Sequence, residues 1–107
     1  MLIAQLTDLH ALPPGETLDG VDTNACTERA VAHVRSLSVQ PDLVVVTGDL
    51  AEGGQVESYR VLREQLDRLP CPYYLCVGNH DRRAEMREVF GDLAYLPRDG
   101  HVQYCVC

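Results

Sequence analysis

The sequence lacks an excess of basic residues. Its 107 residues include 9 Lys and Arg against 16 Asp and Glu, for a formal net charge of −7, and no run of like charges occurs. Proteins that bind the phosphate backbone of DNA or RNA need a basic face. The composition therefore disfavours a nucleic-acid-binding protein.

Long apolar stretches are also lacking. No apolar run approaches the roughly 18 residues that cross a membrane. Met1 leads straight into a short apolar run, without the basic segment and cleavage site of a secretory signal peptide. We therefore expect a cytoplasmic protein with no membrane partner.

The cysteines form no CxxC pair, and their number is odd; they are Cys26, Cys71, Cys76, Cys105 and Cys107. In a cytosolic chain this pattern predicts reduced thiols that pack as small hydrophobic groups. A zinc or redox role for Cys105 and Cys107 is the less favoured alternative.

What the chain does contain is an alternation of strand and helix patterns, without an internal repeat. Apolar runs predict strands over residues 2–6, 43–47 and 73–77, and alternation predicts a fourth over 101–106. Helical spacing predicts helices over residues 22–37, 59–69 and 81–90. Short links between such elements imply right-handed crossovers and a mostly parallel sheet, hence an α/β fold.

Polar residues follow three of the predicted strands. Ligands of parallel sheets bind beyond the carboxyl ends of the strands. There the sequence places Asp8 and His10, then Asp49, then Asn79. Oxygen and imidazole ligands suit divalent manganese, iron or zinc. In extended backbone, Asp8 and His10 point the same way and can hold one ion. The carboxylate of Asp49 can bridge two ions, and the amide oxygen of Asn79 can serve the second.

Electrostatics also favours metal ions at this edge. Asp8, Asp49 and Asp81 would repel a phosphate, and two divalent cations would reverse that sign and acidify a bound water. Ions about 3.5–4 Å apart can hold both the attacking and the leaving oxygen of an in-line displacement. We expect Gly48 and Gly78 to let the backbone turn sharply as it leaves each strand.

The motifs Asp8-x-His10, Gly48-Asp49 and Gly78-Asn79-His80-Asp81, in this order, resemble those of the calcineurin-like metallophosphoesterases. Residues 5–10, 22–25 and 41–44 are most similar to the bacterial class III 3′,5′-cyclic nucleotide phosphodiesterases. The resemblance covers essentially the whole chain.

The resemblance implies a set of metal ligands: Asp8 and His10 for the first ion, Asp49 for both ions and Asn79 for the second. The same resemblance implies that the substrate phosphate lies against His10, Asp49, Asn79 and His80.

Two catalytic residues are implied by the same family pattern. His80 would face the phosphate, as a proton donor to the leaving group or a stabiliser of transition-state charge. Glu52 stands where many members have an aspartate that orients this histidine. Other readings give Glu52 as a solvated loop acid and Asp81 as the N-cap of a helix beginning at Arg82.

The resemblance also implies a larger fold. Family members form an α/β sandwich of two sheets flanked by helices, and residues 1–107 match an incomplete N-terminal βαβαβ half. Members supply later ligands, including a Gly-His-x-His motif, whereas the four histidines here are His10, His33, His80 and His101. We therefore expect a truncated chain or fragment. The helical pattern places His33 on a partly buried face.

The expected function is that of a hydrolase: a metal-dependent phosphodiesterase that cleaves 3′,5′-cyclic nucleotides such as cyclic AMP with a two-metal-activated hydroxide. One alternative is a glycerophosphodiesterase or phosphomonoesterase of the same family. Others are a non-catalytic remnant that binds metal or nucleotide, and a flavodoxin-like or receiver-like regulator with a single metal. Metal identity, base preference and oligomeric state, with a homodimer among the options, stay open.

Overall fold

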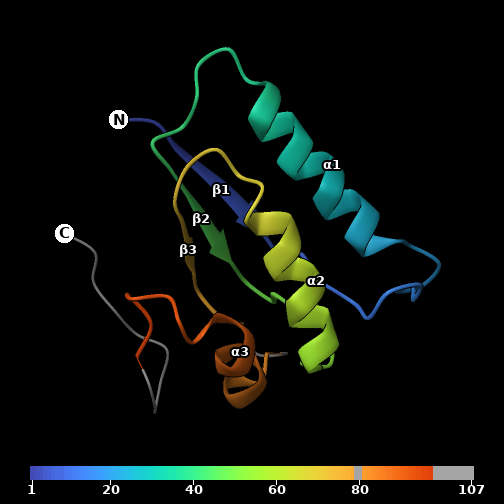
Figure 1. Cartoon of the computed structure of the whole chain (residues 1–107). Helices are drawn as coiled ribbons and strands as arrows, with labels where there is room; N and C mark the ends of the chain where they lie inside the picture. Colours follow the sequence, from blue (N-terminus) through green and yellow to red (C-terminus); the bar gives the residue numbers. More distant parts are fainter. Residues whose placement is uncertain (79–80, 98–107) are drawn as a thin grey trace.

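The computed structural model describes residues 1–78 and 81–97. The described chain forms β1 (Ile3–Thr7), α1 (Thr23–Ser36), β2 (Leu43–Thr47), α2 (Val56–Leu66), β3 (Tyr73–Leu75) and α3 (Arg83–Phe90). The strands form one parallel sheet in the order β1-β2-β3, as Figure 1 shows. The predicted α/β class and the order of these six elements are confirmed.

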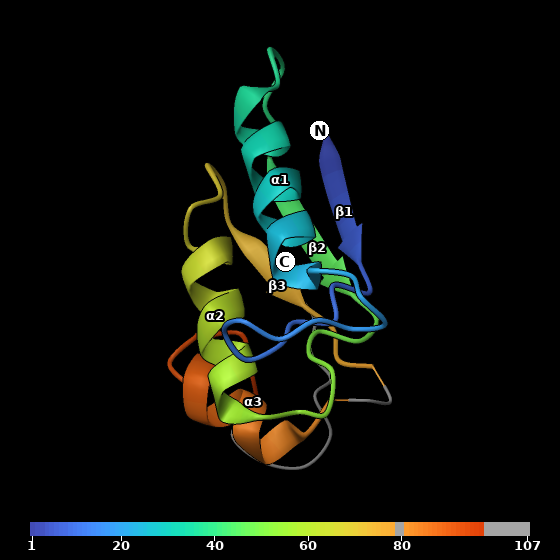
Figure 2. The same ribbon diagram turned by 90° about the vertical axis from the view of Figure 1, so that its right-hand side faces the viewer.

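The central strand β2 is the most apolar part of the sheet. Val44 and Val46 are fully buried, and they pair in register with Ala4 and Leu6 of β1. Because strand side chains alternate between faces, these four residues share one face. Both α1 and α2 cover that face, as Figures 1 and 2 show from two directions.

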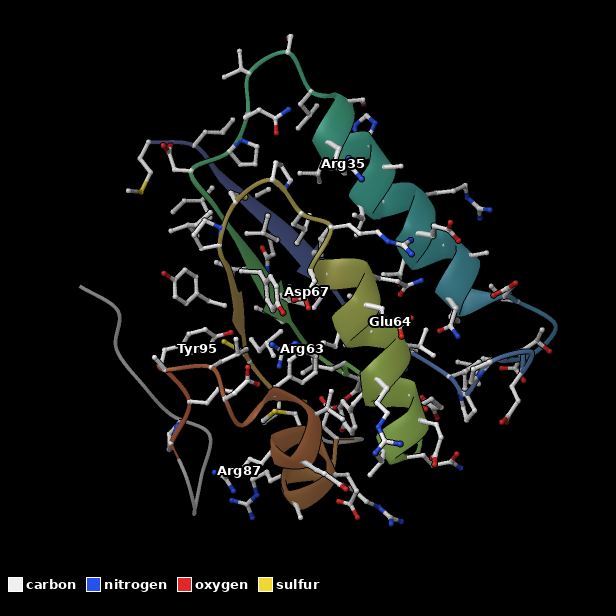
Figure 3. All side chains as sticks on the ribbon, in the orientation of Figure 1. Arg35, Arg63, Glu64, Asp67, Arg87 and Tyr95 are labelled. Atoms are coloured by element: carbon white, nitrogen blue, oxygen red, sulfur yellow. The ribbon has the colours of Figure 1, made fainter. Side chains whose placement is uncertain are left out.

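Helix α2 packs against the sheet through the residues that its spacing predicts. Tyr59, Leu62 and Leu66 recur at steps of three and four and are fully buried. On the side of α2 that faces α3, Arg63 donates to Val89 O at 2.8 Å and to both carboxylate oxygens of Asp92, and its guanidinium lies 5.6 Å from the Phe90 ring centre (Figure 3). These contacts fix α3 against α2.

Several element boundaries differ from the predicted ones. The first helix begins as predicted, because the Asp22 side chain accepts from Ala25 N at 3.0 Å. The third strand ends at Leu75 instead of residue 77, after which Cys76 N still donates to Val46 O at 2.8 Å. Helix α3 begins at Arg83, and its N-cap residue is Arg82. Asp81 is therefore not the N-cap; its carboxylate binds other donors, described below.

The expectations for three side chains on the surface are wrong. His33 is exposed rather than half-buried. Cys26 and Cys76 are free thiols, as predicted, but both are exposed and do not pack in the core. The predicted strand over residues 101–106 lies outside the described residues. Within the described part of the chain, no helix is long and apolar enough to cross a membrane.

Candidate metal centre

The segments that follow β1 and β2 run side by side beyond the sheet. Asp8 N donates to Thr47 O at 2.9 Å, and His10 N donates to Asp49 O at 3.0 Å. Just beyond these residues, Ala11 and Ala51 form a parallel bridge. The sheet pairing therefore continues, in irregular form, past the residues that the sequence places at the strand ends.

Asp8 and His10 do not have the extended backbone on which their common direction was predicted. Their φ angles are 53° and 48°, in the left-handed region. This region costs an L-residue about 1–2 kcal/mol, although Asp and His enter it more readily than most residues. The two side chains meet because two left-handed residues turn the loop.

The side chains of Asp8, His10 and Asp49 form the group of potential metal ligands found among the described residues. One ligand atom from each lies within 4.8 Å of the other two. An ion bound at about 2.0–2.2 Å by such nitrogen and oxygen atoms keeps its ligands within about 4.4 Å of one another. Asp49 is only 8% exposed, whereas Asp8 is exposed. The donor set thus suits one divalent ion, and the 4.8 Å limit on the spacing of its atoms is close to the span of such a site.

Glycines allow the closest approaches in this centre. A Cβ atom at Gly48, whose φ is +76°, would collide with the carboxylate of Asp8. A Cβ atom at Gly78 would collide with the carboxylate of Asp49 and lie 2.7 Å from its backbone nitrogen. Gly48 has the left-handed backbone that suits the expected sharp turn, whereas Gly78 is needed for close approach.

Comparison with known proteins identifies the family of the chain. The sequence matches the family profile of the calcineurin-like phosphoesterases over residues 1–106. The chain belongs to the calcineurin-like phosphoesterase family. Members of this family use divalent metal ions, in agreement with the donor set of the cluster.

Three relatives illustrate the range of similarity. A probable cyclic nucleotide phosphodiesterase of Synechococcus is 42% identical over 96 residues, covering 88% of this chain and 36% of its own. The 3′,5′-cyclic adenosine monophosphate phosphodiesterase of Pseudomonas aeruginosa is 34% identical, covering 81% and 32%. A probable glycerophosphodiester phosphodiesterase of Arcobacter nitrofigilis is 27% identical, covering 99% and 39%. The chain thus spans about a third of the length of the curated relatives it matches.

Within this candidate centre, hydrogen bonds favour the ionised form of Asp8. Thr7 Oγ1 donates to Asp8 Oδ2 at 2.7 Å, and Asp49 N donates to Asp8 Oδ1 at 3.3 Å. Both hydrogen bonds lower the pKa of Asp8, and the bond from the Thr7 hydroxyl has the larger effect. The carboxylate is therefore charged under the conditions in which a cation would bind.

Glu52 contacts His10 among the described residues, whereas the resemblance pairs it with His80, which lies outside them. Its Oε2 atom lies 2.7 Å from Nδ1 of His10. A proton on Nδ1, donated to this carboxylate, makes Nε2 the nitrogen that can bind a cation. Sequence reasoning missed this contact, because nothing in the spacing of residues 10 and 52 indicates it.

Two further predicted site residues, Asn79 and His80, lie outside the described residues. Their metal-binding and catalytic roles stay predictions. The residues that flank them, Gly78 and Asp81, are described, and Gly78 N donates to Asp81 Oδ2 at 2.8 Å.

Proposed function

We propose that the protein containing this chain is a metal-dependent phosphodiesterase that hydrolyses 3′,5′-cyclic nucleotides. The observation that carries the proposal is the meeting of Asp8, His10 and Asp49 at the carboxyl ends of two neighbouring parallel strands. The class of substrate is supported by the names of the similar proteins from Synechococcus and Pseudomonas.

In this proposal, Asp8, His10 and Asp49 hold one divalent ion, and Asp49 and Asn79 hold a second. Manganese, iron and zinc all accept such nitrogen and oxygen ligands. When bound, a pair of these ions supplies Lewis-acid stabilisation of phosphate oxygens and lowers the pKa of water. The burial of Asp49 suits a carboxylate shared between two cations, because paired charge is what permits a carboxylate to be buried.

The remaining residues have supporting roles in this proposal. His10, Asp49, Asn79 and His80 line the place of the phosphate, and His80 gives a proton to the departing ribose oxygen. Glu52, through His10 Nδ1, holds the imidazole ring of a proposed ligand in one orientation. Residues 1–107 form one incomplete domain in this account, with a cytoplasmic location and a small phosphodiester as partner.

A glycerophosphodiester is the second candidate substrate. Two relatives, from Arcobacter and Enterobacter, carry the name glycerophosphodiester phosphodiesterase, and they are 27% and 39% identical to this chain. Both substrates present a phosphodiester to the same ligands, so the described residues favour neither chemically.

The test uses the purified full-length protein, freed of metal and reloaded with Mn²⁺, Fe²⁺ or Zn²⁺. Turnover of cyclic AMP and cyclic GMP is compared with that of glycerophosphocholine and p-nitrophenyl phosphate. We expect metal-dependent hydrolysis with the highest kcat/KM on a cyclic nucleotide. Preference for glycerophosphocholine would select the second candidate. Metal binding without turnover of any of the four would support a non-catalytic remnant and overturn the proposal.

A further inference from the structure

The carboxylate of Asp81 joins three separate parts of the chain. Its Oδ2 atom accepts from Leu50 N at 2.9 Å and from Gly78 N at 2.8 Å. Its Oδ1 atom accepts from Ala51 N at 2.9 Å and from the hydroxyl of Tyr59 at 2.8 Å. The segment after β2, the segment after β3 and helix α2 are thereby tied to one side chain.

These bonds hold two backbone segments that adjoin Asp49, a proposed metal ligand. Leu50 is its neighbour in sequence, and Gly78 lies so close to it that a Cβ atom there would collide with the Asp49 carboxylate. Hydrogen bonds to an ionised carboxylate are roughly twice as strong as neutral ones. The position of the Asp49 backbone therefore depends on Asp81.

Tyr59 in turn holds Asp81. The tyrosine is fully buried on the inner face of α2, and its ring is part of the core. Its hydroxyl donates to Asp81 and accepts from Arg82 N at 3.0 Å. A phenylalanine would fill the same space in the core, so the hydroxyl is not needed for packing. It connects helix α2 to the loop beside the candidate metal centre.

We propose that Tyr59 and Asp81 form a positioning pair that holds Asp49 and the backbone of Gly78 in the geometry needed for metal binding. The inference rests on the proposed function, since it assumes that Asp49 is a metal ligand. Residues that orient metal ligands without touching the metal typically change metal affinity by about 10–100-fold when they are replaced. A residue that only stabilises the fold changes the free energy of unfolding instead.

The test compares Tyr59→Phe with Tyr73→Phe in the full-length protein. Tyr73 is the matched control, because its hydroxyl also donates to a carboxylate, Asp67 Oδ1 at 2.6 Å, but does so away from the metal centre. The Mn²⁺ dissociation constant is measured from the electron paramagnetic resonance of free Mn²⁺. Urea unfolding of the metal-free proteins reports their stability.

We expect Tyr59→Phe to weaken Mn²⁺ binding about tenfold and Tyr73→Phe to change it less than about twofold, within the range known for supporting residues. Asp81→Asn removes the charge from the same network and should weaken Mn²⁺ binding further. This second variant tests the inference if Tyr59→Phe folds poorly. Wild-type affinity in Tyr59→Phe and Asp81→Asn, or equal losses in Tyr59→Phe and Tyr73→Phe, would overturn the inference alone. A wild-type protein that binds none of Mn²⁺, Fe²⁺ and Zn²⁺ would overturn the proposed function itself.

Discussion

The Oε2 atom of Glu52 lies 2.7 Å from Nδ1 of His10, although the two residues follow different strands. The backbone supports this contact, because Glu52 N donates to Ala11 O at 2.9 Å beside His10. About a quarter of each side chain is exposed. The pair places a carboxylate behind one of the four proposed metal ligands, on the ring nitrogen opposite the one that would bind a cation.

Replacing Glu52 with Gln removes the negative charge while keeping the shape of the side chain. We expect Mn²⁺ affinity to fall about tenfold, as for other carboxylates that support a ligating histidine. Glu64→Gln is the control, since Glu64 is exposed on α2 (Figure 3). Unchanged Mn²⁺ affinity with a large fall in kcat would instead support the role implied by the family resemblance, in which Glu52 orients His80.

Gly78→Ala tests the close approach of the backbone to Asp49. The new Cβ atom would collide with the Asp49 carboxylate, so we expect weaker Mn²⁺ binding and lower stability. Gly15→Ala is the matched control, because Gly15 has a φ of +82° and a Cβ atom added there would have no other atom within 4 Å. It should lose only about 1–2 kcal/mol of stability from left-handed strain and keep its Mn²⁺ affinity. Equal affinities in the two variants, measured by titration, would refute the steric account.

Several tyrosines should keep their protons above the pH at which an unfolded tyrosine loses them. Burial raises the pKa of Tyr59 and of Tyr73, and it raises the pKa of Tyr95 to about 12. An unfolded tyrosine titrates near pH ~10. Because the folded pKa values are the higher ones, this contribution to stability is complete below pH ~10 and is lost as the pH rises through the folded values.

Near-ultraviolet absorbance of tyrosinate measures this effect. At a pH of about 11, the folded protein should show less tyrosinate than the same protein in urea, and its free energy of unfolding should be lower than at neutral pH. Equal tyrosinate absorbance in the two states would show that these hydroxyls are not protected by burial.

The sheet and helices could be predicted because their signals, apolar runs for the strands and helical spacing for the helices, lie within single segments. The apolar run 43–47 becomes the buried central strand, and Tyr59, Leu62 and Leu66 form the inner face of α2. The meeting of Asp8, His10 and Asp49 also followed from the sequence, since parallel strands carry their ends to one edge of the sheet.

The local geometry of the site could not be predicted in the same way. Asp8 and His10 come together through left-handed backbone, which residue spacing does not indicate. Asp81 was expected at a helix start, but its carboxylate accepts hydrogen bonds from three backbone amides and from the hydroxyl of Tyr59. Both features depend on how loops from distant parts of the chain pack, and no pattern within one segment records that packing.

His80→Ala tests whether this histidine acts on the phosphate or on a metal ion. Proton donation is typically worth about 10²–10⁴-fold in rate. We therefore expect kcat to fall by that order while the metal content, measured by atomic emission on the purified enzyme, stays at the wild-type value. Loss of metal in parallel with activity would make His80 a ligand instead.

The central claim is that Asp49 is the shared ligand of a two-metal site. The measurement that tests it most directly is a Mn²⁺ titration of the full-length protein followed by electron paramagnetic resonance, with Asp49→Asn, Asp8→Asn and Asp42→Asn beside the wild type. Asp42 is the control, because its carboxylate accepts from Leu2 N at the opposite end of β2.

We predict two Mn²⁺ ions per wild-type chain, with the same stoichiometry and affinity in Asp42→Asn. Asp8→Asn should weaken the binding of mainly one of the two ions. Asp49→Asn should lower the affinity for both ions, by more than the roughly 10–100-fold typical of residues that only support a ligand. Two ions bound with wild-type affinity in Asp49→Asn would contradict the claim.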